Sequence, residues 1–176
     1  MNMVFGIQTN QAMALLLGGL ACLFDLRTRR IPNLLTFGGA ALALGFAVAT
    51  HGLDGLVAGL EGWGVGFALF APMFLLGGMG AGDVKLLACL GAWVGPQDAL
   101  WMGLYAMIAG GVMGIGVALA TGYARKAVSN IWMLLQYWRV MGVRPPPELT
   151  LETSRGPRLP YAIPIAAGAV AAIWMR

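Results

Sequence analysis

The sequence predicts an all-α, polytopic membrane protein with about six transmembrane helices, and three observations lead to this class. Hydrophobic residues make up 59% of the 176 residues and charged residues only 10%, against about 25% charged in an average soluble domain. The apolar residues form long runs, as transmembrane helices require. The basic residues are confined to alternate polar stretches. This composition excludes a cytosolic enzyme, a disordered tail and a nucleic-acid binder, and the length fits a single membrane-embedded domain over 1–176.

The apolar runs predict six helices in order. The first is followed by one that begins at Pro32, a favoured first-turn residue, and Pro72 is expected to kink the third. The fourth is much shorter than the roughly 20 residues of a membrane span, so we expect protein rather than lipid around it. The predicted helices cover 9–24, 32–50, 55–76, 84–94, 100–120 and 159–175.

The distribution of charge predicts the orientation. Ten of the eleven basic residues fall in, or directly beside, the loops that follow the first, third and fifth helices, whereas the opposite loops have acidic residues and one histidine but neither Lys nor Arg. Basic loops are retained in the cytoplasm, so these loops should be cytoplasmic and both ends of the chain outside. The basic residues are Arg27, Arg29, Arg30, Lys85, Arg125, Lys126, Arg139, Arg144, Arg155 and Arg158.

The longest loop, 122–158, contains apolar residues at helical spacing from Ala127 to Trp138, flanked by basic residues. This pattern predicts an amphipathic helix on the cytoplasmic membrane surface, between the fifth and sixth spans. A lid over a functional site is the alternative. Three consecutive prolines, Pro145 to Pro147, should end the helix with a stiff extended segment.

Two acidic residues, Asp25 and Asp83, lie at cytoplasmic helix ends beside apolar runs, and Asp83 follows a glycine-rich stretch. Two carboxylates close together in a low-dielectric site cannot both ionise easily, so they share a proton near neutral pH. Such a pair can hydrolyse a peptide bond by acid–base chemistry, without a metal or a covalent intermediate. The plainer alternative is that Asp25 pairs with Arg27 or Arg29 and that Asp83 only caps its helix.

Three stretches resemble motifs of the type IV prepilin peptidases. DLRTRRIPN at 25–33 resembles their first aspartate motif, and GAGDVKL at 80–86 resembles the second, a GxGD motif shared with presenilin-like intramembrane aspartic proteases. LPYAIP at 159–164 is similar to the stretch that opens the last helix of the family, although Ala162 stands where glycine is usual. The small size most resembles the Tad/CpaA branch, which processes Flp-type pilins.

The resemblance implies that Asp25 and Asp83 are the catalytic pair. It also implies six supporting residues around this pair, and none of them is expected to bind a metal. Gly80 and Gly82 would shape the loop that presents Asp83. Lys85 would either anchor its helix at the membrane interface or tune the pKa of Asp83. The supporting residues are Gly80, Gly82, Lys85, Arg30, Pro32 and Asn33.

The resemblance further implies an aspartic endopeptidase of the bacterial inner membrane that cuts the basic leader from a pilin-like precursor. The partners are that precursor and the lipid bilayer, with no nucleic acid and no cofactor, and the oligomeric state stays open. Larger members also methylate the new pilin N-terminus and carry a cysteine tetrad. This chain has two cysteines, and 24 residues precede Asp25, so we expect no methyltransferase activity. A small proton- or ion-coupled transporter and a non-enzymatic pilus or secretion scaffold are the alternatives.

Overall fold

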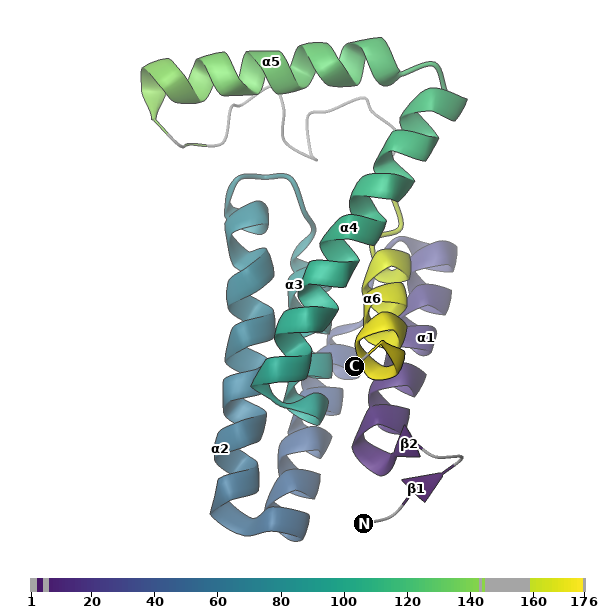
Figure 1. The fold of residues 1–176 in the computed structure, drawn as a ribbon, viewed down its shortest axis with the longest axis vertical. Coiled ribbons are helices and arrows are strands. Elements are labelled where there is room, and N and C mark those ends of the chain that lie inside the picture. The colour runs from purple at the N-terminus through teal and green to yellow at the C-terminus, as the bar shows by residue number, and fades with distance from the viewer. Residues whose placement is uncertain (1–2, 5–6, 143, 145–158, 176) are drawn as a thin grey trace.

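A computed structural model of the chain describes residues 3–4, 7–142, 144 and 159–175. They form a bundle of apolar helices with one further helix, α5, lying crosswise beyond one end (Figure 1). We call this the α5 end of the bundle, and the opposite end the Gly52 end. The all-α class predicted from the sequence is confirmed, apart from two short antiparallel strands, β1 (Met3–Val4) and β2 (Ile7–Gln8), that the sequence analysis did not predict.

The helix α1 (Thr9–Thr28) runs from the Gly52 end to the α5 end (Figure 1). A single turn of π-helix, η1 (Leu34–Gly38), follows and continues directly into α2 (Gly39–Leu75). The second and third predicted helices are the two arms of α2, which reverses direction at Gly52, where φ is 62° and ψ is −141°. This left-handed conformation favours glycine. The interruption of α2 therefore lies at Gly52 rather than at Pro72.

The helix α3 (Ala81–Val94) is almost wholly buried in the bundle. It crosses the second arm of α2 at glycines, since a Cβ added to Gly62 would meet the backbone of Gly91, and one added to Gly66 would meet that of Leu87. Small residues allow this close approach of backbones. At 14 residues and 1.5 Å rise per residue the helix is about 21 Å long. The prediction that protein rather than lipid surrounds this short helix is confirmed.

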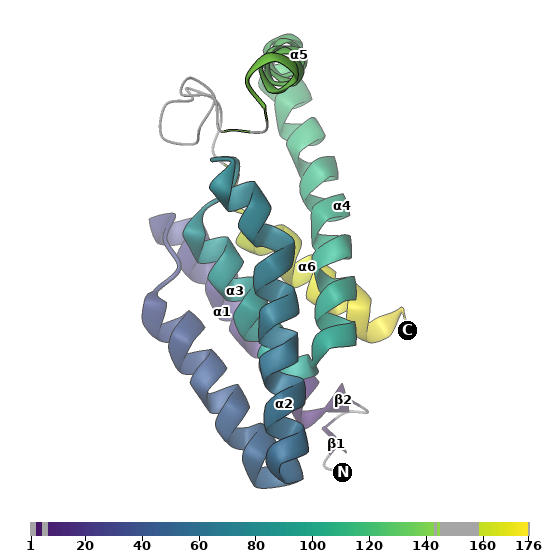
Figure 2. The same ribbon diagram turned by 90° about the vertical axis from the view of Figure 1, so that its left-hand side faces the viewer.

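The helices α4 (Pro96–Ala120) and α6 (Ala162–Trp174) pack closely, because a Cβ at Gly168 would meet the α4 backbone at Met102. The helix α5 (Ala124–Met141) is present where an amphipathic helix was predicted, and none of its described residues is buried. Val128, Ile131 and Trp132 are all more than half exposed. Figure 2 shows α5 beyond the end of α4 rather than over the ends of α1 and α3, so the lid alternative gains no support.

Three helical segments of the described chain are long and apolar enough to cross a membrane: Thr9–Thr28, Leu34–Leu75 and Pro96–Ala120. The second is 42 residues long and contains both arms of α2, whereas α6 is apolar but shorter. All six predicted apolar helices are thus present. Their bounds differ by a few residues: α1 continues to Thr28, α4 begins already at Pro96, and α6 begins only at Ala162.

Candidate active site

Three segments that are distant in the sequence meet at the α5 end of the bundle. They are the last turn of α1, the first turn of α3 and the first turn of α6 (Figures 1 and 2). These segments carry the three motifs singled out in the sequence. The two carboxylates predicted to lie at the same depth, Asp25 and Asp83, are therefore at the same end of the molecule.

Asp25 lies on the inward face of α1, one turn before the helix ends, and is only 8% exposed. Its Oδ2 accepts a hydrogen bond of 3.3 Å from the backbone N–H of Ala162, the first residue of α6. One turn earlier on α1, the Cys22 thiol donates to the carbonyl oxygen of Ala162 at 3.2 Å. Both backbone groups of Ala162 are thus held by α1, which fixes the Asp25 carboxylate against the start of α6.

Asp83 is the third residue of α3 and is half-buried. The N-cap residue of this helix is Gly80, so the alternative in which Asp83 itself is the N-cap is wrong. The Asp83 carboxyl instead receives a backbone hydrogen bond from Gly80, as the acid at the third position of a capping box does. A Cβ at Gly80 would lie 3.1 Å from Asp83 Oδ2, which explains why a residue without a side chain stands there.

The carboxyl groups of Asp25 and Asp83 are close enough for the charge of one to act on the other. Asp25 is held by a backbone donor and is nearly inaccessible, whereas Asp83 is the more accessible of the two. The fold thus brings two carboxyl groups of different accessibility to the same end of the bundle.

The first two motifs also contact each other away from the carboxylates. A Cβ at Gly82 would lie 3.4 Å from the Cβ of Ile31, which is ordinary van der Waals contact. The Lys85 Nζ donates to Asn33 Oδ1 at 3.1 Å and lies 5.1 Å from the centre of the Phe37 ring. Lys85 thus joins the start of α3 to η1, and both roles expected for it stay open.

The remaining supporting residues lie in the connection between α1 and η1. Pro32 precedes the helical segment, and its carbonyl oxygen accepts the first hydrogen bonds, from Leu35 and Thr36 at 3.0 and 3.3 Å. Arg30 is exposed, and its carbonyl oxygen accepts a hydrogen bond from the Thr28 hydroxyl at 3.1 Å. Its guanidinium is therefore available to the surroundings of the site rather than packed within it. The π-helical turn η1 that follows is a feature frequently found at functional sites.

The sequence analysis did not identify Cys22 and Tyr161 as site residues. The Tyr161 hydroxyl lies near enough to Asp83 to feel its charge. It packs against Gly110 of α4, and its ring meets the edge of Phe70 with centroids 6.1 Å apart. Tyr161 lies within the third motif, and Cys22 lies one helical turn before Asp25. The sequence therefore contained a signal for each of these two residues. At Ala162, where glycine is usual in the family pattern, the hydrogen bonds with Asp25 and Cys22 are made by the backbone.

His51, which the sequence placed away from the aspartates, lies at the turn of α2 at the Gly52 end (Figure 1). Across the described part of the chain, no three His, Cys, Asp or Glu residues lie together as a metal site would require. Several residues of the long loop lie outside the described residues. They are Pro145, Pro146, Pro147, Glu148, Glu152, Arg155 and Arg158.

The arrangement has the components of general acid–base chemistry on a peptide group. One carboxylate can remove a proton from water while a protonated carboxyl donates to a carbonyl oxygen. Burial of the pair in the bundle end strengthens both interactions. Four of the six residues at 77–82, directly before Asp83, are glycines.

The chain is similar in sequence to proteins of one known family. The model of the type IV leader peptidase family matches residues 12–115, which contain both Asp25 and Asp83. A prepilin leader peptidase/N-methyltransferase from Myxococcus xanthus (strain DK1622) is 36% identical over 107 residues, 57% of this chain and 30% of that protein. A protein of the same description from Aeromonas hydrophila is 41% identical over 69 residues, 38% of this chain and 24% of that protein.

The aligned regions thus span less than a third of the length of these two relatives. No solved structure shows significant similarity to the chain. The family match itself covers more than half of the 176 residues and includes the first two motifs in their order. From this match, the chain belongs to the type IV leader peptidase family.

Proposed function

We propose that this protein is a membrane aspartic endopeptidase that removes the short basic leader from a pilin-like precursor, with Asp25 and Asp83 as the catalytic residues. The observation that carries the proposal is the buried Asp25 carboxylate, fixed by the Ala162 N–H and within electrostatic reach of Asp83. Family membership supports the same chemistry. The two relatives described as prepilin leader peptidases support a pilin precursor as the substrate.

In the proposed mechanism the ionised carboxylate takes a proton from a water molecule, and the water oxygen attacks the carbonyl carbon of the scissile bond. The protonated carboxyl donates its proton toward the carbonyl oxygen, which becomes a hydroxyl of the tetrahedral intermediate. Collapse of this intermediate breaks the C–N bond, and the amine leaves with the proton that the first carboxyl had taken from water. As the C=O bond re-forms, the hydroxyl returns its proton to the second carboxylate. Hydrolysis consumes one water and restores the shared proton of the pair.

The proposed location is the cytoplasmic face of a bacterial inner membrane. The α5 end carries most of the basic residues of the described chain, whereas the loops at the Gly52 end carry no Lys or Arg. Basic residues near membrane-spanning helices are retained on the cytoplasmic side. The apolar helix of the substrate would lie in lipid beside the bundle, with the cut just beyond its cytoplasmic end, where water reaches the backbone.

The proposal includes two more specific points, the type of precursor that is cut and the lack of methylation. We propose Flp-type precursors as substrates, following the resemblance to the Tad/CpaA branch. We also propose that the protein does not methylate the product. The two cysteines cannot form a tetrad, and they are engaged separately, Cys22 with Ala162 and Cys89 with the Leu35 carbonyl oxygen at 3.9 Å.

The test is leader removal in cells that lack other prepilin peptidases. The full chain is co-expressed with a tagged Flp-type precursor, and loss of the leader is scored by gel mobility and by mass spectrometry of the product. Cleavage between leader and apolar helix is the expected result. A precursor that stays uncut beside well-expressed protein contradicts the Flp assignment if a different pilin precursor is cut. If no pilin precursor is cut, the peptidase proposal itself fails, and the scaffold alternative takes its place.

A further inference from the structure

The start of α6 brings a third polar side chain to the two aspartates. Tyr161 is the N-cap residue of α6, and it directly precedes Ala162, whose backbone N–H donates to Asp25. The Tyr161 hydroxyl lies near enough to Asp83 for the charge of that carboxyl to act on it. The backbone of Tyr161 thus adjoins the partner of one aspartate, and its side chain is close to the other.

The side chain of Tyr161 is held in one position. A Cβ added to Gly110 of α4 would meet the hydroxyl oxygen and the ring carbon that bears it, so the end of the side chain packs directly on α4. The ring meets the edge of Phe70, which is fully buried, with centroids 6.1 Å apart. The following residue, Ala162, is bound by α1 through both its N–H and its carbonyl oxygen. Ring and backbone are both fixed, so the hydroxyl is a preorganised group.

The donor of the Tyr161 hydroxyl is not used within the described part of the chain. Tyr161 is half-buried, and none of the described residues is hydrogen-bonded to its hydroxyl. Across the same residues, the one enclosed side-chain nitrogen or oxygen without a partner is Trp93 Nε1, so the Tyr161 hydroxyl is not enclosed. A tyrosine hydroxyl carries one donor, and here that donor is available to a bound peptide.

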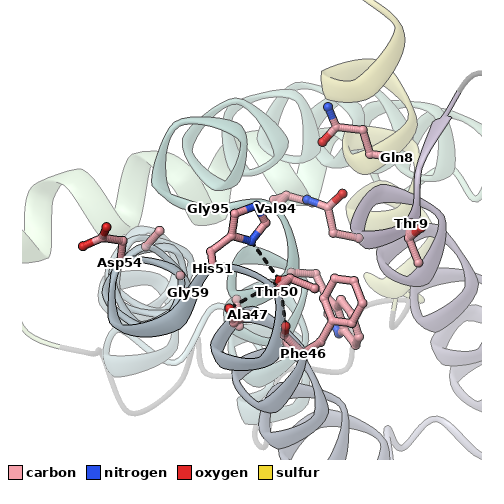
Figure 3. Close-up of a pocket in the computed structure, with 16 residues that line it drawn as sticks. Gln8, Thr9, Phe46, Ala47, Thr50, His51, Asp54, Gly59, Val94 and Gly95 are labelled. Atoms are coloured by element: carbon pink, nitrogen blue, oxygen red, sulfur yellow. Dashed lines mark hydrogen bonds between the residues drawn. The ribbon is translucent and has the colours of Figure 1, made fainter. Parts of the chain in front are cut away.

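The polar groups at the other end of the bundle are arranged differently. A cavity of about 660 Å³ opens at the Gly52 end, and Thr50, His51 and Trp93 are among the residues that line it (Figure 3). The Thr50 hydroxyl donates to the carbonyl oxygen of Phe46 at 2.8 Å and is also hydrogen-bonded to His51 Nδ1 at 2.8 Å (Figure 3). This hydroxyl is engaged within the protein, whereas the hydroxyl of Tyr161 is fixed beside a carboxyl group and has its donor free.

We propose that the Tyr161 hydroxyl is a further catalytic group, which donates a hydrogen bond to the carbonyl oxygen of the scissile peptide bond. This inference rests on the proposed peptidase function and adds one residue to the same site. The carbonyl oxygen accepts from Tyr161 on one side while the protonated carboxyl donates to it on the other. Negative charge develops on this oxygen as water attacks, and a preorganised donor stabilises that charge. The Tyr161 proton stays on the hydroxyl, so the proton balance of the mechanism is unchanged.

The test is Tyr161→Phe in the full chain, with cleavage of a purified precursor measured in mixed micelles. Phenylalanine keeps the ring that packs on Phe70 and removes only the hydroxyl. Loss of one preorganised donor should lower kcat by about 10²- to 10³-fold, with little change in KM and in thermal unfolding. Tyr105→Phe removes a hydroxyl from another half-buried tyrosine, stacked on Trp101 in α4, and is the matched control that should cleave at the normal rate.

Two analogues of the cleavage-site peptide give a readout that a packing role of Tyr161 would not produce. One has a hydroxyethylene group in place of the scissile peptide group, so that its hydroxyl oxygen stands for the oxygen of the tetrahedral intermediate. The other has an ethylene group and lacks this oxygen. Tyr161→Phe should weaken binding of the first analogue about 2- to 10-fold, as expected for one hydrogen bond, and leave binding of the second unchanged.

Normal cleavage by the Tyr161→Phe enzyme overturns the inference, and so does equal weakening of the two analogues. A displaced pH–rate profile of this variant also overturns it, because the hydroxyl would then act through Asp83 rather than on the substrate. A wild-type enzyme that cuts no pilin precursor overturns the proposed function and the inference with it. Wild-type cleavage beside an unaffected Tyr161→Phe enzyme overturns the inference alone.

Discussion

Replacement of either aspartate by asparagine is the sharpest test of the proposed chemistry. Asparagine keeps the size of the side chain and an oxygen that can accept from the Ala162 N–H, which now reaches Asp25 Oδ2 at 3.3 Å. It removes the group that exchanges a proton. Asp25→Asn and Asp83→Asn should therefore leave the fold in place while the rate of leader cleavage falls.

The change should have a small effect on stability and a large effect on the cleavage rate. The change at Asp25 exchanges a charged hydrogen bond for a neutral one, a difference of about 1 kcal/mol in the free energy of unfolding. A positioned acid or base contributes about 10²–10⁴ in rate, which is about 3–5 kcal/mol of barrier. Because the proposed mechanism uses the two carboxyl groups as one unit, the double variant should be little slower than either single variant.

The assay is cleavage of a purified precursor in mixed micelles, with rates normalised to enzyme measured by immunoblot. Asp98→Asn and Glu61→Gln, distant from the site, are the matched carboxyl-to-amide controls and should cleave at the normal rate. A well-folded Asp83→Asn enzyme that cleaves at the normal rate would refute the aspartic mechanism. Additive losses in the double variant would instead show that the two carboxyls act independently.

Three further predictions address topology, modification and the third motif. Reporter fusions near Gly142 should lie in the cytoplasm and fusions near Gly52 outside, and finding both on one side would refute the orientation. Purified enzyme given precursor and S-adenosylmethionine should yield an unmethylated product by mass spectrometry, and a methyl group that depends on this chain alone would contradict the single activity. Gly110→Ala places a Cβ against the Tyr161 hydroxyl, so thermal unfolding should show a loss of about 1–3 kcal/mol from overpacking together with slower cleavage. Gly111→Ala, which meets nothing within 4 Å, should change neither, and equal effects of the two would show that the contact with Tyr161 is unimportant.

The structure also explains why helix ends and breaks were the least predictable features. The sequence predicts a break between 50 and 55 and a kink at Pro72, and α2 reverses at Gly52, within that break, and continues through Pro72. The left-handed conformation of Gly52 has no distinctive local pattern in a chain with 27 glycines. Whether such a residue becomes a turn depends on the packing of the two arms, such as the close approach of Gly55 to Ala47.

Within the candidate site, Lys85 and Ala162 also make contacts that could not be predicted from the sequence. The sequence left two roles open for Lys85, and the structure adds contacts with Asn33 and Phe37 that the sequence did not predict. At Ala162 the structure adds two backbone hydrogen bonds with α1. The residue acts through its backbone, and a side-chain pattern in the sequence does not report backbone hydrogen bonds.

The sequence by itself determined the all-α membrane class, the six apolar helices, the amphipathic helix between the fifth and sixth of them, and the two aspartates at one end. These features depend on composition, periodicity and the placement of charge, which are local properties of the chain. Only the tertiary structure decided that the Ala162 N–H holds Asp25, that Tyr161 lies beside Asp83, and that Trp93 lines a cavity at the other end. Each of these contacts joins residues from different helices, and its geometry is set by how closely the small residues allow those helices to pack.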